Sequence, residues 1–459
     1  MAATNTAAPR VDISELFNTR PFTSYQLGIC FLCLCVSVLD GFDNQVMGFA
    51  APSIAQALHL SPKALGSAFS AGQIGALIGA LGLGTLADRL GRKRMLILCA
   101  CIFGFFTLLI TRVNTVEQLA LCRLLGGIGL GGTIPNALAF GAEYAPRRLR
   151  ASLTTLMWLG LPIGSASSGF AAAYMLTKYS WHAMFLLGGL LPLVIALLVA
   201  LLLPESLAFL VKQGKDEAQI RRVVAKISPA LAQNKNMELY STEKRLPGVP
   251  VKHLFSEGRA LTTFLIWMLF FLSFFMLIFL SSWTPTLLKQ SGATLRQASI
   301  AFSFFHIGSM IATVGIGRIM DKSNPYRILT LTFVASGIMV AVFGVLAHLP
   351  FGIVTVLAIV TGFFVCGANS GIMALAAISY PVAIRGTGIG WAYAMGRFGA
   401  MSGPMLGGLL LARHWSVGLI CTTVGIAGFL TAGVVVVLKD HTTGLVRRIE
   451  TVQVARAMQ

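Results

Sequence analysis

Long apolar segments recur along the whole chain, and they constrain its fold more than any other feature. A membrane-spanning helix needs about 20 consecutive apolar residues. Of the 459 residues, 56% are hydrophobic and only 11% are charged, a composition typical of proteins that cross a membrane many times. The sequence therefore predicts an all-α membrane protein with twelve transmembrane helices, at roughly residues 24–50, 62–87, 95–113, 115–141, 151–177, 182–203, 260–288, 296–320, 327–347, 350–379, 388–412 and 415–438.

The net charge of +19 is distributed unevenly around these segments. Because loops rich in lysine and arginine stay in the cytoplasm, this asymmetry predicts that both termini are cytoplasmic, with attraction to anionic lipid as a secondary effect. The excess charge is thus a topology signal, and nucleic-acid binding is not expected. In the first half, the basic residues on the side of the N-terminus are Arg10, Arg20, Arg89, Arg92, Lys93, Arg94, Arg147, Arg148 and Arg150, against Lys63, Arg112 and Lys178 on the other side.

Short motifs occur in both halves of the chain at nearly constant spacing. Gly84 matches Gly317 and Asp88 matches Asp321 with the same separation along the chain, and Arg150 matches Arg385 with almost the same one. Two matched loops in one register indicate an internal duplication, in which two six-helix bundles arose from one unit.

The chain is accordingly divided into five parts. The bundles are predicted at residues 24–203 and 260–438, with an N-terminal tail at 1–23 and a C-terminal tail at 439–459, both cytoplasmic. The segment 204–259 is polar and basic, so it is predicted to be a cytoplasmic linker between the bundles. A short amphipathic helix is expected there, around residues 216–227.

Two carboxylates, Asp40 and Asp43, lie inside the first apolar segment. A charge at the centre of a membrane helix costs roughly 2.5–3.5 kcal/mol, and such groups usually mark an ion or proton path. Three residues apart, the two acids share one helix face. At about 1.5 Å per residue, Asp43 is expected about 10 Å from the outer edge and Arg123 about 12 Å. We expect the acids to pair with Arg123 and to carry protons; a purely structural ion pair is the alternative.

Polar and aromatic residues of the second half are candidates for substrate binding. Arg397 lies near the middle of the eleventh segment, and its planar guanidinium suits bidentate binding of a carboxylate. His306 is either a ligand-binding group or a buried histidine with satisfied hydrogen bonds. The other candidates for the cavity are Trp391, Tyr393, Asn369, Trp283 and Phe302.

The first repeated loop reads Gly84-x-x-x-Asp88-Arg89-x-Gly91-Arg92-Lys93. It resembles the signature of the major facilitator superfamily, whose halves are six-helix repeats, and the resemblance covers about residues 20–440. It implies that this loop latches the halves in the outward-open state, with Gly84 allowing a close approach of two helix ends. The gating residues that it implies are Gly84, Asp88, Arg89 and Arg92, with Asp321 and Arg385 in the matching loops.

The stretch Asp40-Gly41-Phe42-Asp43, together with Arg385-Gly386-Thr387-Gly388 and Gly396-Arg397, resembles a narrower family. These are the aromatic acid:proton symporters of the bacterial inner membrane. The resemblance implies import of a hydroxybenzoate-, protocatechuate- or benzoate-like carboxylate together with protons. The residues that it implies in proton coupling are Asp40, Asp43, Arg123 and Glu143, and those in substrate binding are Arg397, Arg123, Asp40 and Asp43.

Several alternatives stay open at this point. Glu143 is expected either to gate with Arg147 or Arg150 or to cap a helix end. Symport of another organic acid and drug/proton antiport by the same fold are the competing functions. No nucleophile–base pair or metal-ligating set is visible in the sequence, so we expect neither an enzyme nor a cofactor. Nothing in the sequence indicates an oligomeric state.

Overall fold

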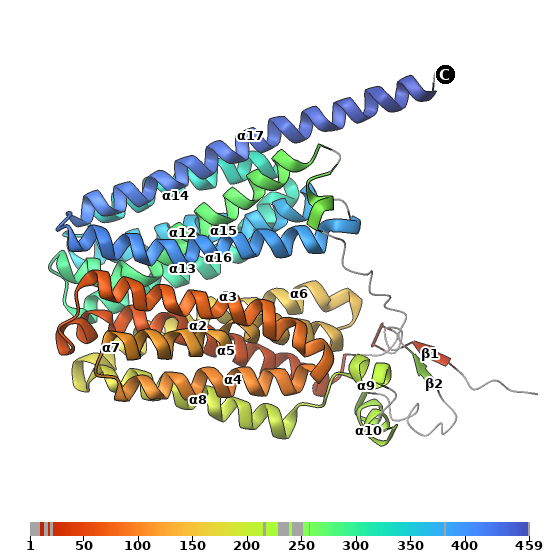
Figure 1. The fold of residues 1–459 in the computed structure, drawn as a ribbon, viewed down its shortest axis with the longest axis horizontal. Helices are drawn as coiled ribbons and strands as arrows, with labels where there is room; N and C mark the ends of the chain where they lie inside the picture. Colours follow the sequence, from red (N-terminus) through yellow and green to blue (C-terminus); the bar gives the residue numbers. More distant parts are fainter. Residues whose placement is uncertain are drawn as a thin grey trace, which may run out of the picture.

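The computed structural model describes residues 10–12, 17–18, 22–213, 217–227, 238–240, 251–256, 258–380 and 382–457, and long helices dominate this part of the chain (Figure 1). The helices of the first half are α2 (Ser24–Ala57), α3 (Pro62–Leu90), α4 (Arg92–Leu109) with the 3-10 turn η1 (Ile110–Arg112), α5 (Val116–Tyr144), α6 (Arg147–Trp158), α7 (Gly160–Lys178) and α8 (Trp181–Leu202). Those of the second half are α12 (Ala260–Gln290), α13 (Leu295–Lys322), α14 (Pro325–Val345), α15 (Phe351–Ser379), α16 (Val382–Ala412) and α17 (Val417–Ala457).

These helices confirm the predicted fold class. Among the described residues, eleven segments are long and apolar enough to cross a membrane, with α6 and α7 counted as one segment. The remaining long helix is α16, which is rich in glycine and carries Arg385 and Arg397. The long helix that is not among the eleven thus holds two of the residues that are candidates for function.

The two halves form two bundles that lie side by side (Figure 1), and the internal duplication is visible in their packing. In the first bundle α2 packs on α7, α3 on α5, and α4 on α8; in the second, α12 packs on α16, α13 on α15, and α14 on α17. We call the end at which α8 finishes and α12 begins the linker end. The opposite end, with the turns at 58–61, 113–115 and 291–294, is the far end.

The fifth span is broken, whereas the sequence predicted one helix over 151–177. The helix α6 ends at Trp158 and α7 begins at Gly160. Pro162 explains the position of the break, because a proline removes the hydrogen bond to the carbonyl four residues earlier and its ring crowds that carbonyl. Trp158 is the residue four positions before Pro162.

Short elements lie beside the two bundles. Beside the first are α9 (Leu207–Gln213) and α10 (Glu217–Ile227) of the linker. The 3-10 turn η2 (Val251–Leu254) packs on the second bundle, where the carbonyl of Leu254 accepts from the hydroxyl of Thr263. A parallel pair of strands joins β1 (Arg10–Asp12) of the N-terminal tail to β2 (Glu238–Tyr240) of the linker, with Arg10 opposite Glu238. The helix α10 confirms the one expected at 216–227. Its apolar residues recur at helical spacing and join a buried cluster that also contains Ile29 of α2 and Leu203; they are Ile220, Val223, Val224 and Ile227.

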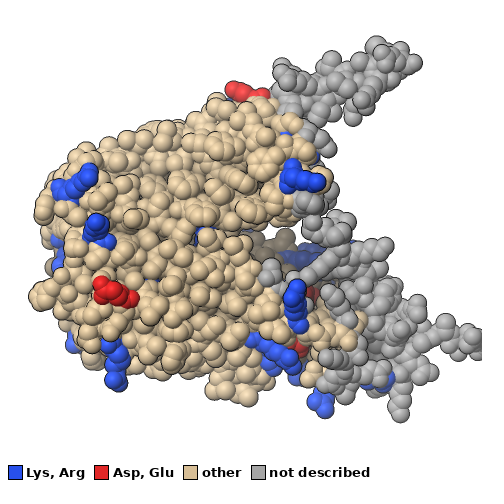
Figure 2. All heavy atoms as spheres, in the orientation of Figure 1, with Lys and Arg blue, Asp and Glu red and all other residues tan. Residues whose placement is uncertain are grey.

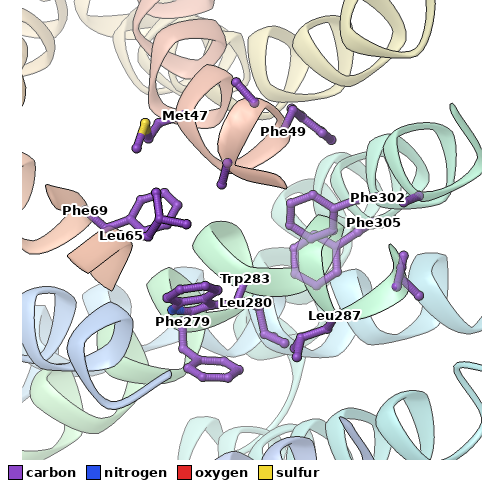
Figure 3. Close-up of a cluster of buried hydrophobic side chains, with 14 of the residues drawn as sticks. Met47, Phe49, Leu65, Phe69, Phe279, Leu280, Trp283, Leu287, Phe302 and Phe305 are labelled. Carbon is purple, nitrogen blue, oxygen red and sulfur yellow. The ribbon is translucent and has the colours of Figure 1, made fainter. Parts of the chain in front are cut away.

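At the far end the two bundles are in close contact, through the cluster of apolar side chains in Figure 3. Phe49 and Phe302 meet edge to face with their ring centroids 5.8 Å apart, and Phe69 meets Trp283 in the same way at 5.5 Å. At Gly48, an added Cβ would lie 2.6 Å from the carbonyl oxygen of Ser281, so α2 and α12 approach each other at backbone level. Trp283 and Phe302, expected in a cavity, thus belong to this closed contact.

At the linker end the molecule is hollowed between the bundles (Figure 2). Most of the charged side chains visible in Figure 2 lie near the two ends, and a broad uncharged band separates them. This band matches the apolar surface that a protein presents to lipid. The structure therefore has one closed end and one open end along the axis of the helices.

Candidate functional site

A cavity of about 620 Å³ lies between the two bundles. Both halves supply polar side chains to its wall, among otherwise apolar residues. From the first half these include Asp40, Asn44, Gln45, Gln73 and Arg123, and from the second half His306, Ser309, Asn369, Tyr393 and Arg397. A pocket with mostly apolar walls and a few convergent polar groups is the usual form of a small-molecule site.

Asp40 lies on the cavity wall and is 4% exposed. Its Oδ2 accepts a hydrogen bond from Nδ2 of Asn44 at 3.2 Å. Its Oδ1 is buried and has no hydrogen-bond partner in the described part of the chain. A buried carboxylate oxygen without a partner is costly, so this carboxyl group is poised to take a proton or a polar ligand.

Asp43 turns away from the cavity and pairs with Arg123. Nη1 of Arg123 lies 3.5 Å from Oδ2 of Asp43, and the hydroxyl of Thr107 donates to Oδ1 at 3.0 Å. The side chains of Arg123 and Asp43 are only 7% and 1% exposed. The predicted pairing with Arg123 is therefore confirmed for Asp43, whereas Asp40 faces the cavity.

The predicted depth of the acids needs correction. The helix α2 continues to Ala57, beyond the predicted end at residue 50, because Pro52 is accommodated within it. At about 1.5 Å per residue, Asp43 lies about 21 Å from the far end instead of about 10 Å. Both acids are thus near the middle of the helix.

Arg397 connects the two bundles across the cavity. Its Nη1 donates to Oε1 of Gln73 at 3.4 Å, and its Nη2 donates to the hydroxyl of Tyr393 at 3.2 Å. The guanidinium also lies over the ring of Tyr393, 5.2 Å from its centroid. Nε of Arg397 is buried without a partner among the described residues, so the guanidinium keeps a donor for a ligand.

His306 and Asn369 reach the cavity, whereas Trp391 does not. Asn369 lies on the wall and donates to the hydroxyl of Ser273 at 3.1 Å. Trp391 was expected beside the substrate, but it is 43% exposed and stacks on Trp267 with centroids 6.0 Å apart. It therefore lies on the outside of the bundle and not, as expected from the sequence, on the cavity wall.

Glu143 lies at the linker end and is not part of the cavity wall. Its Oε1 is 3.1 Å from Nη2 of Arg92, and its Oε2 accepts from the hydroxyl of Ser206 at 2.5 Å. The ion pair with Arg92, at the start of α4, is a contact that the sequence did not predict. Together with the hydrogen bond to Ser206 it ties α4, α5 and the segment after α8 together.

Glu205 belongs to the same region and was missed by the sequence analysis. Its Oε1 accepts from the backbone N–H groups of Lys93 and Ser206, at 3.0 and 2.9 Å. This caps the start of α4, where helix N–H groups lack partners. Gly91 makes room for it: its φ is +102°, and an added Cβ would lie 2.5 Å from the Glu205 carboxylate.

The repeated loops are only partly described. The side chains of Asp88 and Asp321 lie outside the described residues. Among the described residues, a Cβ added at Gly84 or at Gly317 would meet nothing within 4 Å, so none of them makes the close approach that was expected at Gly84. Arg89 is exposed, and Nε of Arg385 donates to the carbonyl of Tyr380 at 3.4 Å.

The chain matches the Major Facilitator Superfamily over residues 33–359 and again over 292–455. It is 36% identical to the 4-hydroxybenzoate transporter PcaK of Pseudomonas putida, covering 95% of this chain and 97% of that protein. It is 38% identical to the protein of the same name from Pseudomonas aeruginosa, covering 89% and 92%. Among solved structures, the D-xylose-proton symporter superposes with a TM-score of 0.70 at 18% identity, covering 89% of this chain and 97% of that one. The family resemblance predicted from the sequence is confirmed.

Proposed function

Because the chain belongs to the major facilitator superfamily, we propose that it imports an aromatic carboxylate together with protons by alternating access. The substrate is hydroxybenzoate-, protocatechuate- or benzoate-like, in keeping with the names of the relatives. The membrane is the bacterial inner membrane, with both chain termini in the cytoplasm. The observation that carries this proposal is a cavity between two bundles that holds an arginine and an acid with unpartnered polar atoms.

Arg397 binds the substrate carboxylate in this proposal. Its guanidinium lies on the cavity wall, and Nε has no partner among the residues that the structure describes. The hydrogen bonds that it makes to described residues go to neutral acceptors, Gln73 and Tyr393. A carboxylate is the stronger acceptor for a guanidinium. The ring of Tyr393 and that of Phe274, which meet edge to face at 5.3 Å, offer apolar surface for an aromatic ring.

Asp40 and the Asp43–Arg123 pair couple the proton in this proposal. Asp40 faces the cavity, and its Oδ1 has no partner in the described part of the chain, so a proton from the aqueous side reaches it first. Asp43 is held by Arg123 and Thr107 behind the wall. Protonation of an acid of this group removes a buried charge, weakens its attraction to the arginine and lets the bundles rock.

The conformation described here is the inward-facing state in this proposal. The far end is sealed by the aromatic contacts of Phe49 and Phe69 with the second half, and the hollow opens at the linker end (Figure 2). Gly84 and Gly317 have open space around them. We expect them to meet the opposite bundle when the linker end closes.

The test is uptake by purified protein in proteoliposomes with an imposed pH gradient. Labelled 4-hydroxybenzoate is expected to accumulate when the outside is acidic, and accumulation is expected to stop when a protonophore collapses the gradient. A panel of sugar acids and dicarboxylates serves as the comparison. Uptake that ignores the gradient would refute symport, and a preference for an aliphatic acid would refute the aromatic substrate.

A further inference from the structure

Two uncharged polar side chains at the closed end of the cavity have atoms without partners. Gln45 and His306 are each 5% exposed and both lie on the cavity wall. Oε1 of Gln45 and Nε2 of His306 are buried, and neither has a hydrogen-bond partner within the described residues. Buried polar groups are nearly always satisfied, so such exceptions call for a physical reason.

The two side chains come from opposite bundles at the same depth. Gln45 lies on α2, which reaches the far end at Ala57, and His306 lies on α13, which starts from that end at Leu295. Counted along each helix at about 1.5 Å per residue, both are about 17–18 Å from the far end. One turn beyond them, the contact of Phe49 with Phe302 closes the cavity. Gln45 and His306 thus form its floor, shared between the two halves.

The ring of His306 is held in place by aromatic neighbours. It meets Phe302 and Phe305 edge to face, with centroids 5.0 and 5.3 Å apart. The amide oxygen of Gln45 only accepts hydrogen bonds, whereas a neutral imidazole donates from one of its nitrogens. A hydroxyl group both donates and accepts. The pair is therefore complementary to one hydroxyl group, which would donate to Gln45 and accept from His306.

We propose that Gln45 and His306 form a subsite for a ring hydroxyl of the substrate, on the side of the ring opposite its carboxylate. This rests on the proposed function, in which Arg397 holds the carboxylate. Arg397 lies on α16, which ends at Ala412, and the same count at about 1.5 Å per residue places it about 22 Å from the far end. It is therefore about 4–5 Å nearer the linker end than the floor when depth is counted along the helices, so the carboxylate and the hydroxyl would be bound at different depths in the cavity.

The subsite predicts discrimination by hydrogen bonding. A substrate without the hydroxyl leaves Gln45 and His306 unpaired. A site that hydrogen-bonds a substrate hydroxyl discriminates strongly against an analogue without it, whereas an apolar pocket discriminates only weakly against an analogue that carries an additional hydroxyl. Because the two groups belong to different bundles, a bound hydroxyl also bridges the halves beside the closed far end. Binding of the hydroxylated acid is thereby linked to the sealed state of that end.

The first experiment varies the ligand and leaves the protein unchanged. Uptake competition in proteoliposomes compares 4-hydroxybenzoate with 4-methoxybenzoate, which accepts but does not donate, and with 4-methylbenzoate, which does neither. We expect the inhibition constant to rise by about 10–100-fold from the hydroxyl to the methyl compound, with the methoxy compound between. The 3-hydroxy isomer is expected to bind more weakly than the 4-hydroxy isomer. Equal inhibition by all four acids would overturn the subsite while leaving aromatic acid transport intact.

The second experiment varies the protein. In the variants Gln45→Leu and His306→Phe, the ratio of the inhibition constants for benzoate and 4-hydroxybenzoate is expected to fall to about 3 or less. Benzoate uptake should continue, since only the hydroxyl loses its partners. His306→Gln restores a donor and should recover part of the preference. Thr313→Val, on the same wall of α13, is the matched control and should keep the full preference. An undiminished preference in both single variants would overturn the proposal; no uptake of any aromatic acid by the unmodified protein would instead refute the proposed function.

Discussion

Asp43 and Arg123 allow the role of the buried charges to be tested quantitatively. Their side chains are almost fully buried and their charged atoms are 3.5 Å apart. Breaking a buried ion pair by removing one partner costs about 3–5 kcal/mol, because the remaining charge is left uncompensated. Arg123→Gln and Asp43→Asn are each expected to lower the free energy of unfolding by about this amount. The double variant removes both charges and should be more stable than the sum of the single effects predicts, by about 2–3 kcal/mol.

The measurement is a double-mutant cycle in detergent, with unfolding followed by intrinsic fluorescence. Thr107→Val serves as a control, since it removes the hydroxyl that donates to the Asp43 carboxylate but leaves both charges in place, and it should cost about 1.5–3 kcal/mol. Uptake is measured in parallel: the double variant is expected to fold and bind substrate without gradient-driven accumulation. Strictly additive effects would contradict the ion pair, and gradient-driven accumulation by the double variant would contradict its role in coupling.

Four further variants follow from the structure. Asp40→Asn should bind and exchange substrate across the vesicle membrane but lose accumulation driven by a pH gradient, as counterflow and net uptake assays would show. Arg397→Lys should raise KM for 4-hydroxybenzoate about 10-fold or more, because a lysine lacks the planar guanidinium that binds a carboxylate with two hydrogen bonds. An unchanged KM would show that Arg397 does not bind the substrate carboxylate. Gly48→Leu places a side chain where a Cβ already lies 2.6 Å from the Ser281 carbonyl, so spin-label distances should show the far end forced open. Gly91→Ala should lower the free energy of unfolding by about 1–3 kcal/mol, because its φ of +102° and ψ of 144° form a combination that residues other than glycine rarely adopt. A melting temperature equal to that of the unmodified protein would refute this.

The charged residues of the site could be found from the sequence because charge is conspicuous in an apolar segment. Asp40, Asp43, Arg123 and Arg397 stand out for that reason, and all four lie on or directly behind the cavity wall. Gln45 and Gln73 were missed, since a glutamine costs far less in hydrocarbon than a charge and leaves a weaker signal. A search for amides inside the spans would have found them.

Other errors came from the geometry of the helix and from distance along the chain. At about 100° per residue, Tyr393 is four positions before Arg397 and shares its face, whereas Trp391 is six positions before and points elsewhere. Counting would have excluded Trp391 from the cavity. The partner of Glu143 was not accessible in this way, because Arg92 approaches it from another helix. Such contacts depend on packing, which periodicity does not specify.

The duplicated architecture holds two different sets of chemical groups. The register that relates Asp88 to Asp321 in the repeated loops also places Gln73 at the position of His306. In the same register, the neutral Ser273 and Met276 stand at the positions of Asp40 and Asp43. The two halves therefore share a polar position on the cavity wall but not the acidic pair.

The ion pair thus has no counterpart in the second half, and the described residues that hold it, Asp43, Thr107 and Arg123, all belong to the first. The second half instead supplies Arg397 and Tyr393 to the cavity. This supports a division in which the first bundle handles the proton and the second holds the carboxylate. Yet the division is incomplete, since Gln73 of the first bundle binds Arg397 directly. In the proposed mechanism, a carboxylate that binds the guanidinium competes with Gln73 for it, so substrate binding at Arg397 would affect the first bundle, as coupling between proton and substrate requires.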